Sequence, residues 1–277
     1  MVKALLVLLL FFSFLYAEAT PKDPLMLKIK SFLSQTSYAD NKDFINVIFE
    51  PKSAFYTKER VNVVKVIQTL KENGLLNLFF SSPQEFSLHF KTSGYPLFFV
   101  KIMEDTLQSL GYFRYVTTAS NFDSSEFSWS INLTSEYATD PLILQNELRK
   151  SGCAIVDIEK NSDKEWTYII DIANGHLNVP QLHMGEVVKL KRSLYAHWLD
   201  ISKIRSLRIT SSRRNRWYPY IAYYDASLHL LELFKREKIY KDLTLKMPKN
   251  ARYIKISDMY TLKNLKDEII LYPKGKR

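Results

Sequence analysis

The stretch from residue 213 to residue 220, Arg-Arg-Asn-Arg-Trp-Tyr-Pro-Tyr, holds the side chains best suited to bind a ligand. Its guanidinium groups present planar donors that fit carboxylates and phosphates, and its aromatic rings present flat faces for stacking. Such a site would act by charge and stacking rather than by chemistry. The alternative is a solvated arginine loop beside a buried strand. The candidate binding residues are Arg213, Arg214, Arg216, Trp217, Tyr218 and Tyr220.

Side chains suited to catalysis do not cluster in the sequence. The histidines show no HExxH spacing, and only His176 and His183, which flank one predicted loop, invite a shared metal ion. The aspartates of the last third stand at predicted strand ends or turns, where Asp is common. We therefore expect a protein that is not an enzyme, with no catalytic residue, no metal site and no cofactor. The histidines are His89, His176, His183, His197 and His229, and the aspartates are Asp200, Asp225, Asp258 and Asp267.

The chain has one cysteine, Cys153, which follows a glycine and precedes an apolar run. A single cysteine forms no intramolecular disulfide, so stability has to come from packed cores. Because no histidine or asparagine motif accompanies it, we expect a buried, unreactive thiol rather than a nucleophile.

One pattern occurs three times between residues 55 and 175: an amphipathic helix that ends at a glycine, a short strand, a polar turn and an aromatic-led strand. The glycines are Gly74, Gly111 and Gly152, and the period is about 40 residues. Apolar residues stand four and eight positions before each glycine, on one helical face that can pack on its own hairpin. The glycine then supplies the left-handed residue that ends a helix.

The remaining segments are assigned from local patterns. A helix is predicted over 23–35, strands over 44–49 and 112–116, and hairpin turns at 81–84, 120–125 and 161–164. After residue 175, short apolar runs separated by breakers predict an antiparallel β-sandwich. The runs are 194–201, 204–210, 217–224, 228–234, 243–247, 252–257 and 268–272.

The N-terminus has the pattern of an export signal. Lys3 is followed by an apolar run from Ala4 to Tyr16, broken only by Ser13, and by an Ala-x-Ala site at 17–19. The alternative is an uncleaved membrane anchor, but such a run rises about 20 Å as a helix, short of the roughly 30 Å hydrocarbon core. We expect cleavage and a periplasmic mature protein.

The fold class expected is α+β, with tandem αββ modules followed by a β-sandwich. The expected units are a signal peptide, 1–19; an N-terminal helix and strand that form a cap or degenerate module, 20–54; αββ modules, 55–94, 95–136 and 137–175; and a basic β-sandwich, 176–277.

Charge divides the chain. Residues 1–175 hold 17 Lys plus Arg against 20 Asp plus Glu (17 − 20 = −3), and residues 176–277 hold 22 against 9 (22 − 9 = +13). This asymmetry indicates a partner surface. Export argues against nucleic acid and leaves anionic glycan, lipid headgroups, an acidic protein or a further copy of the chain.

Residues 107–116, Leu-Gln-Ser-Leu-Gly-Tyr-Phe-Arg-Tyr-Val, followed by an aromatic strand, resemble the helix–Gly–strand–strand part of POTRA domains. The resemblance covers about residues 55–175 and implies a scaffold for protein contacts in envelope machines. The signal peptide, repeats and composition also resemble those of FlgQ-type periplasmic accessory proteins of the polar flagellar motor, known from Campylobacter relatives. The strand order and the Trp-x-Pro turn at 217–219 are similar to those of galactose-binding-like jelly rolls.

Two hypotheses of function follow. The first is a non-enzymatic periplasmic scaffold or assembly protein of a bacterial envelope complex such as a polar flagellar motor or its disc. Its partners would be other envelope proteins or further copies of itself. The second is a periplasmic carbohydrate-binding protein that uses residues 213–220 on peptidoglycan or surface polysaccharide.

Overall fold

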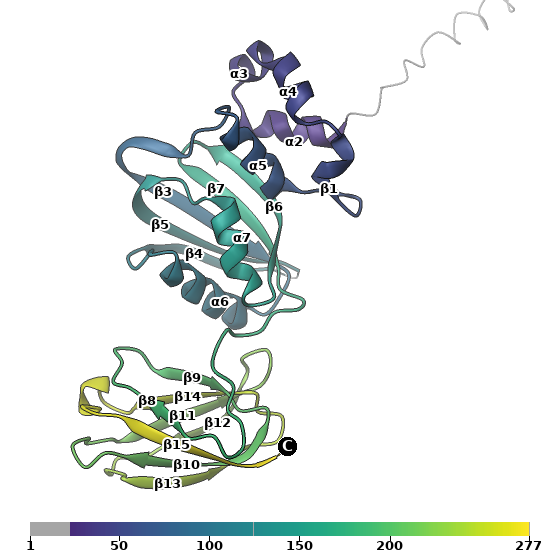
Figure 1. Ribbon diagram of the computed structural model, residues 1–277. Helices are drawn as coiled ribbons and strands as arrows, with labels where there is room; N and C mark the ends of the chain where they lie inside the picture. The colour runs from purple at the N-terminus through teal and green to yellow at the C-terminus, as the bar shows by residue number, and fades with distance from the viewer. Residues whose placement is uncertain (1–22, 124, 277) are drawn as a thin grey trace, which may run out of the picture.

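A computed structural model describes residues 23–123 and 125–276 (Figure 1). The predicted signal peptide lies outside the described residues. The chain is an α+β protein with two parts, which we call the N-terminal part (23–175) and the C-terminal part (176–276). Within the described ranges, no helix is long and apolar enough to cross a membrane.

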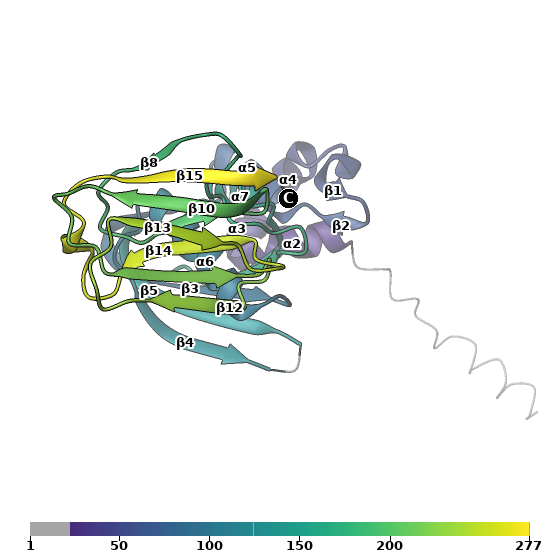
Figure 2. The same ribbon diagram turned by 90° about the horizontal axis from the view of Figure 1, so that it is seen from below.

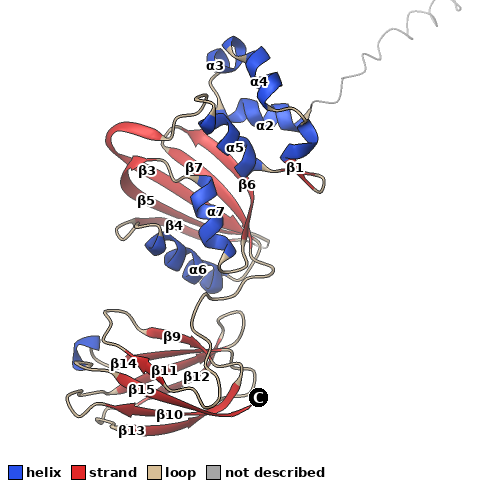
Figure 3. Cartoon of the chain, in the orientation of Figure 1, coloured by secondary structure: helices blue, strands red, loops and turns tan. Residues whose placement is uncertain are grey.

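The N-terminal part is built on one five-stranded sheet. Its strand order is β4-β5-β3-β7-β6, and only the β3–β7 pair is parallel. Helices α5, α6 and α7 cover one face of the sheet (Figures 1 and 3). The strands are β3 (Phe79–Thr92), β4 (Val116–Phe122), β5 (Phe127–Tyr137), β6 (Ala154–Ser162) and β7 (Glu165–Asp171). The helices are α5 (Val63–Glu72), α6 (Pro96–Ser109) and α7 (Pro141–Arg149).

A small helical unit precedes the sheet and packs beside α5 and β6. It consists of α2 (Pro24–Phe32), α3 (Gln35–Asp40), α4 (Lys42–Ile48), the 3₁₀ helix η1 (Lys52–Phe55) and a short hairpin of β1 (Tyr56–Thr57) and β2 (Arg60–Val61). Asp23 caps α2, since its carboxylate accepts from the backbone N–H of Leu25 at 3.0 Å.

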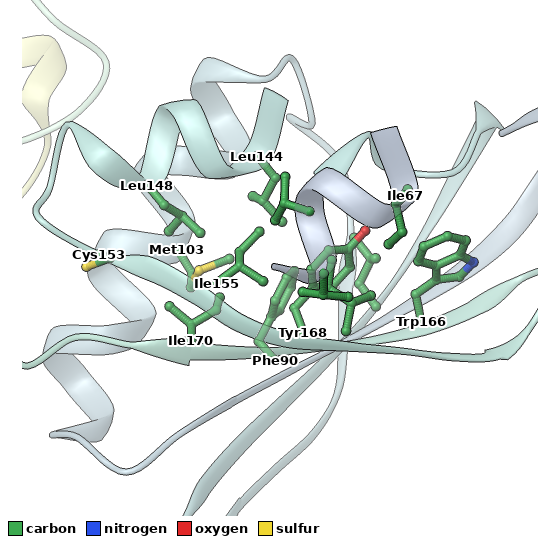
Figure 4. Close-up of a cluster of buried hydrophobic side chains, with 14 of the residues drawn as sticks. Ile67, Phe90, Met103, Leu144, Leu148, Cys153, Ile155, Trp166, Tyr168 and Ile170 are labelled. Atoms are coloured by element: carbon green, nitrogen blue, oxygen red, sulfur yellow. The ribbon is translucent and has the colours of Figure 1, made fainter. Parts of the chain in front are cut away.

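The three predicted helices and their glycine ends are confirmed. Gly74, Gly111 and Gly152 have φ of 73°, 89° and 70°, the left-handed conformation that the helix ends require. The residues four and eight positions before each glycine are fully buried against the sheet, in a core that Figure 4 shows in part. They are Val66, Leu70, Met103, Leu107, Leu144 and Leu148. All three repeats contribute strands to the one sheet.

Three predictions of local structure were wrong. The predicted turn 81–84 lies inside β3. Phe79 of β3 pairs with Tyr137 of β5, but Gln84 already pairs with Ser135, so β3 advances five residues where β5 advances two. Pro83 lacks a backbone N–H, so the ladder bulges and then resumes. The predicted strand 44–49 is helix α4, since Ile45 and Phe49 are buried at helical spacing. The predicted strand 112–116 begins only at Val116.

The C-terminal part consists of two four-stranded antiparallel sheets, with orders β13-β10-β15-β8 and β12-β11-β14-β9. Residues from both sheets share one core, which includes Leu207, Ile221 and Ile256. The seven predicted strands are confirmed, and the three-residue β8 was missed because it is too short to show alternation. The strands are β8 (Val188–Leu190), β9 (His197–Asp200), β10 (Ile204–Ser211), β11 (Pro219–Tyr224), β12 (Leu230–Lys235), β13 (Asp242–Lys246), β14 (Tyr253–Asp258) and β15 (Ile269–Lys276), with the 3₁₀ helix η2 (Leu262–Asn264) between the last two.

The two parts pack on each other through α6. Leu228 and Tyr253 of the C-terminal part are buried in the core cluster of the N-terminal part. The Tyr253 hydroxyl accepts a hydrogen bond from the backbone N–H of Leu177 at 3.0 Å. Figure 1 shows α6 between the five-stranded sheet and the two-sheet part.

The helix ends supply a test of this architecture. A Cβ at Gly152 would lie 2.3 Å from the carbonyl oxygen of Asn174, whereas a Cβ at Gly74 would meet nothing within 4 Å. Gly74→Ala is expected to cost about 1–2 kcal/mol, the left-handed penalty alone. Gly152→Ala is expected to cost clearly more, because the Asn174 backbone has to move. Urea unfolding of both variants measures the difference, and equal losses would contradict the close packing at Gly152.

Candidate functional site

The predicted arginine segment forms a loop that is anchored by two side chains, Asn215 and Lys241. Asn215 is buried, and its amide group donates to the carbonyl of Glu268 at 3.1 Å and accepts from the N–H of Asp267 at 2.7 Å. The Lys241 ammonium donates to the carbonyls of Ser212 and Arg213 at 3.1 and 3.0 Å. The buried Asn215 amide and the Lys241 ammonium therefore hold the loop in this conformation.

The loop brings some of the predicted binding residues together and separates others. Arg213, Arg214 and Arg216 are exposed. Tyr218 is half-buried, and its ring meets that of Tyr260 edge-on at 4.9 Å. Trp217 is fully buried in the core of the C-terminal part and donates to the carbonyl of Ser257 at 2.9 Å, so it has no face to offer a ligand.

Tyr220 is also set apart from the arginines. It is half-buried within β11, where it pairs with Ser257 on one side and Lys235 on the other. The segment thus presents three guanidinium groups and one tyrosine pair to a ligand, but not the indole ring of Trp217.

The aspartates of the C-terminal part bind nearby backbone N–H groups. Asp200, Asp225 and Asp258 accept from residues two positions ahead at 2.8–3.0 Å, and Asp267 accepts from the next residue at 2.9 Å. Within the described ranges, no three His, Cys, Asp or Glu side chains gather in a metal-binding arrangement, and His176 and His183 join none. Cys153 is buried as predicted, and burial raises the pKa of its thiol to about 12.

One polar arrangement on the open sheet face was not anticipated. His89 of β3 has Nδ1 2.8 Å from the hydroxyl of Ser130 and Nε2 3.0 Å from a carboxylate oxygen of Glu165. Hydroxyl, imidazole and carboxylate in sequence form the hydrogen-bond pattern of a catalytic triad, in which the imidazole takes the hydroxyl proton. His89 pairs with Ser130 across β3 and β5, and Glu165 lies on β7 on the other side of β3, so we interpret the group as a cross-strand ladder that ties three strands together.

A cavity of about 690 Å³ lies between the two parts. One wall is the polar face of α6, where Lys101, Glu104, Asp105 and Gln108 follow helical spacing. The other wall comes from β9, the preceding loop and β14, and the linker closes the end. These residues include Asn178, Val179, Pro180, Tyr195, His197, Trp198 and Lys255.

Trp198 is the centre of this interdomain cleft. Its ring packs on Tyr224 with centroids 5.0 Å apart, and the ammonium groups of Lys101 and Lys255 each lie 5.5 Å from its centroid. Lys101 also pairs with Asp105 at 2.5 Å. Lysines from the N-terminal and C-terminal parts therefore meet on one indole ring.

Two titratable groups in the cleft are perturbed by their surroundings. Partial burial raises the pKa of the Glu104 carboxyl, while Lys101 and Lys255 oppose that rise. Burial lowers the pKa of the His197 imidazole, so this ring is neutral at pH 7. Neither side chain makes a hydrogen bond or ion pair with another described residue, so both can bind a ligand.

Sequence reasoning missed this cleft for a physical reason. The spacing of Lys101, Glu104, Asp105 and Gln108 marks a polar helix face and was available from the sequence. Its pairing with Trp198 depends on how the two parts pack, which no local pattern encodes.

Neither a scan against protein-family models nor a search of curated proteins gives a match to this chain. A proposal for the function of this protein therefore has to be argued from its own sequence and structure.

The perturbed carboxyl supplies a test of the cleft. Because the folded pKa of Glu104 is raised, folding disfavours its ionised form, a penalty absent below the ordinary pKa near 4.3 and present at neutral pH. The difference in Tm, Glu104→Gln minus wild type, is expected to be positive at pH 7 and to shrink at about pH 4. Lys101 and Asp105 on α6 and Lys255 on β14 are the charged groups near Glu104. A difference that does not change with pH would contradict the assignment.

Proposed function

We propose that this protein is a non-enzymatic periplasmic scaffold or assembly protein of a bacterial envelope complex. The supporting observation is a bare, uncharged sheet edge at β4. Its residues, Val-Thr-Thr-Ala-Ser-Asn-Phe, include no charged side chain and no proline. Because an edge strand has unpaired backbone groups, such an edge is a template for a partner strand.

The opposite edge of the same sheet is protected. Strand β6 carries charged residues, and its Asp157 pairs with Lys28 of α2 at 2.6 Å. Helix α2 also packs against β6. One edge is thus charged and covered, and the other is neither, so the β4 edge is the one suited to strand addition.

Apolar side chains surround the open edge. Val116 and Phe122, the two ends of β4, are each 66% exposed. Figure 2 shows β4 at the rim of the sheet. Large apolar side chains left in water next to a free edge favour burial by another protein.

The finer assignments are part of this proposal. We take the N-terminal part as POTRA-like and the complex as a polar flagellar motor or its disc, on the repeat pattern and the export signal. We take the C-terminal part as a jelly roll, because two sheets of orders β13-β10-β15-β8 and β12-β11-β14-β9 suit that eight-stranded fold. The partners are then other envelope proteins or further copies of this chain.

Charge placed on β4 tests the scaffold proposal. Thr118→Lys combined with Ser120→Lys is expected to abolish recovery of partners when the tagged protein is purified from crosslinked envelopes, because charged side chains block strand addition. Both positions are exposed, so Tm is expected to change little. Mass spectrometry of the recovered proteins gives the readout.

The matched control is Thr134→Lys, an exposed threonine on the interior strand β5. It adds one positive charge, where the β4 variant adds two, and it lies on an interior strand, so it is expected to leave partner recovery unchanged. Undiminished recovery with the β4 variant would contradict the proposal.

A second function, carbohydrate binding, is favoured by the anchored arginine loop. Three exposed guanidinium groups beside the Tyr218–Tyr260 pair suit an anionic glycan. Changing Arg213, Arg214 and Arg216 to Glu is expected to abolish binding of an acidic polysaccharide without altering partner recovery. Binding by the unchanged protein is expected to weaken as salt rises, since screening shortens to about 8 Å at physiological ionic strength. Salt-resistant binding would exclude a charge-led contact.

A further inference from the structure

We propose that the interdomain cleft binds a neutral polysaccharide chain between α6 and β9. This site is separate from the arginine loop, and it does not depend on the β4 edge. Its hydrogen-bonding groups are Glu104, Gln108, Asn178 and His197, and its stacking rings are Phe113 and Tyr195.

The first argument is the charge of the cleft. Its lining holds two lysines, Lys101 and Lys255, and two acids, Glu104 and Asp105 (2 − 2 = 0). The whole C-terminal part is strongly basic, so a balanced cleft is a local exception. A balanced lining does not favour a highly charged ligand, because repulsion from one pair offsets attraction to the other.

The second argument is a surplus of free hydrogen-bonding groups. The side chains of Glu104, Gln108, Asn178 and His197 all line the cleft, and none has a hydrogen-bond partner among the described residues. The carboxylate accepts, the amides donate and accept, and the neutral imidazole does both. A polyhydroxyl ligand matches this mixture, since each sugar hydroxyl both donates and accepts.

The third argument is the placement of aromatic rings. Phe113 comes from the N-terminal part and is 70% exposed, and Tyr195 comes from the C-terminal part and is 63% exposed. Both line the cleft, one contributed by each part. Apolar ring faces next to hydrogen-bonding groups suit the flat C–H faces and polar rims of sugars.

The cleft is also formed before any ligand binds. The Leu177–Tyr253 hydrogen bond fixes the linker, and the Tyr95 and His229 rings meet across the interface at 5.1 Å. A Cβ at Gly175 would lie 2.9 Å from a ring carbon of Phe98, so the linker runs directly against α6. Walls fixed in this way bind without a large ordering cost.

A peptide is the less favoured occupant. β9 is the edge of its sheet, yet the linker already occupies part of that edge: Asp200 donates its N–H to the carbonyl of Pro180 at 2.9 Å and accepts from the N–H of Leu182 at 2.9 Å. Strand addition at this edge would have to displace the linker.

Tryptophan fluorescence offers a direct readout. The chain has four tryptophans, and Trp129, Trp166 and Trp217 are 3% exposed or less, so Trp198 is the one that solvent reaches. A hexamer of β-1,4-linked N-acetylglucosamine is the neutral probe, and a hexamer of galacturonic acid is the acidic one. The neutral hexamer is expected to protect Trp198 from acrylamide quenching and to give a binding isotherm by calorimetry.

Variants decide whether the cleft is responsible. Glu104→Gln and His197→Ala are each expected to weaken binding of the neutral hexamer about tenfold or more, the range for one lost hydrogen bond to a charged or buried polar group. Trp198→Phe keeps an aromatic ring, so it is expected to retain binding while the quenching change disappears. Changing Arg213, Arg214 and Arg216 to Ala together is expected to leave binding of the neutral hexamer unaltered.

Several results would overturn the proposal. The first is that the wild-type protein does not bind the neutral hexamer, and the second is that Glu104→Gln and His197→Ala leave its binding unchanged. The third is that the acidic hexamer protects Trp198 from quenching more than the neutral one does. The fourth is that a peptide is crosslinked in the cleft while the neutral hexamer does not bind. A Tm within a few degrees of wild type for each variant separates lost binding from lost folding.

Discussion

Helix α6 is the element on which the arrangement of this protein depends. One face, with Phe99, Ile102 and Met103, is buried against the five-stranded sheet, and Lys101 and Glu104 form the wall of the interdomain cleft. Near its start, Phe98 lies against Gly175 of the linker. Because the same fourteen residues serve the core, the interface and the cleft, a change in α6 affects both parts of the molecule.

The functional surfaces follow from what the fold covers and what it leaves open. The β6 edge is covered by α2 and carries charge, whereas the β4 edge is uncovered and uncharged. The C-terminal part carries exposed arginines on a loop that Asn215 holds in place. In the cleft, by contrast, the two lysines and the two acidic side chains balance in charge. These differences are the basis on which we propose an assembly protein with a strand-pairing edge and separate glycan contacts.

The sequence predicted elements that local patterns determine. The glycine-ended helices and seven strands of the C-terminal part were found, because periodicity and breakers are local signals. The prediction of a turn at 81–84 was wrong, because Ser and Pro also suit a bulge within a long strand. Only the pairing of β3 with β5 distinguishes the two. Trp217 proved to be core rather than a binding surface, an alternative the sequence had left open. The cleft around Trp198 was beyond prediction, because it requires the packing of two parts far apart in the sequence.

Hydrogen–deuterium exchange of β4 in the partner-bound and free protein is the most direct test of the central claim. If the protein assembles through this edge, the outward-facing backbone amides of residues 116–122 become protected in the crosslinker-free complex, and those of β6 exchange as before. Unchanged exchange along β4, with protection elsewhere on the surface, would contradict assembly through this edge.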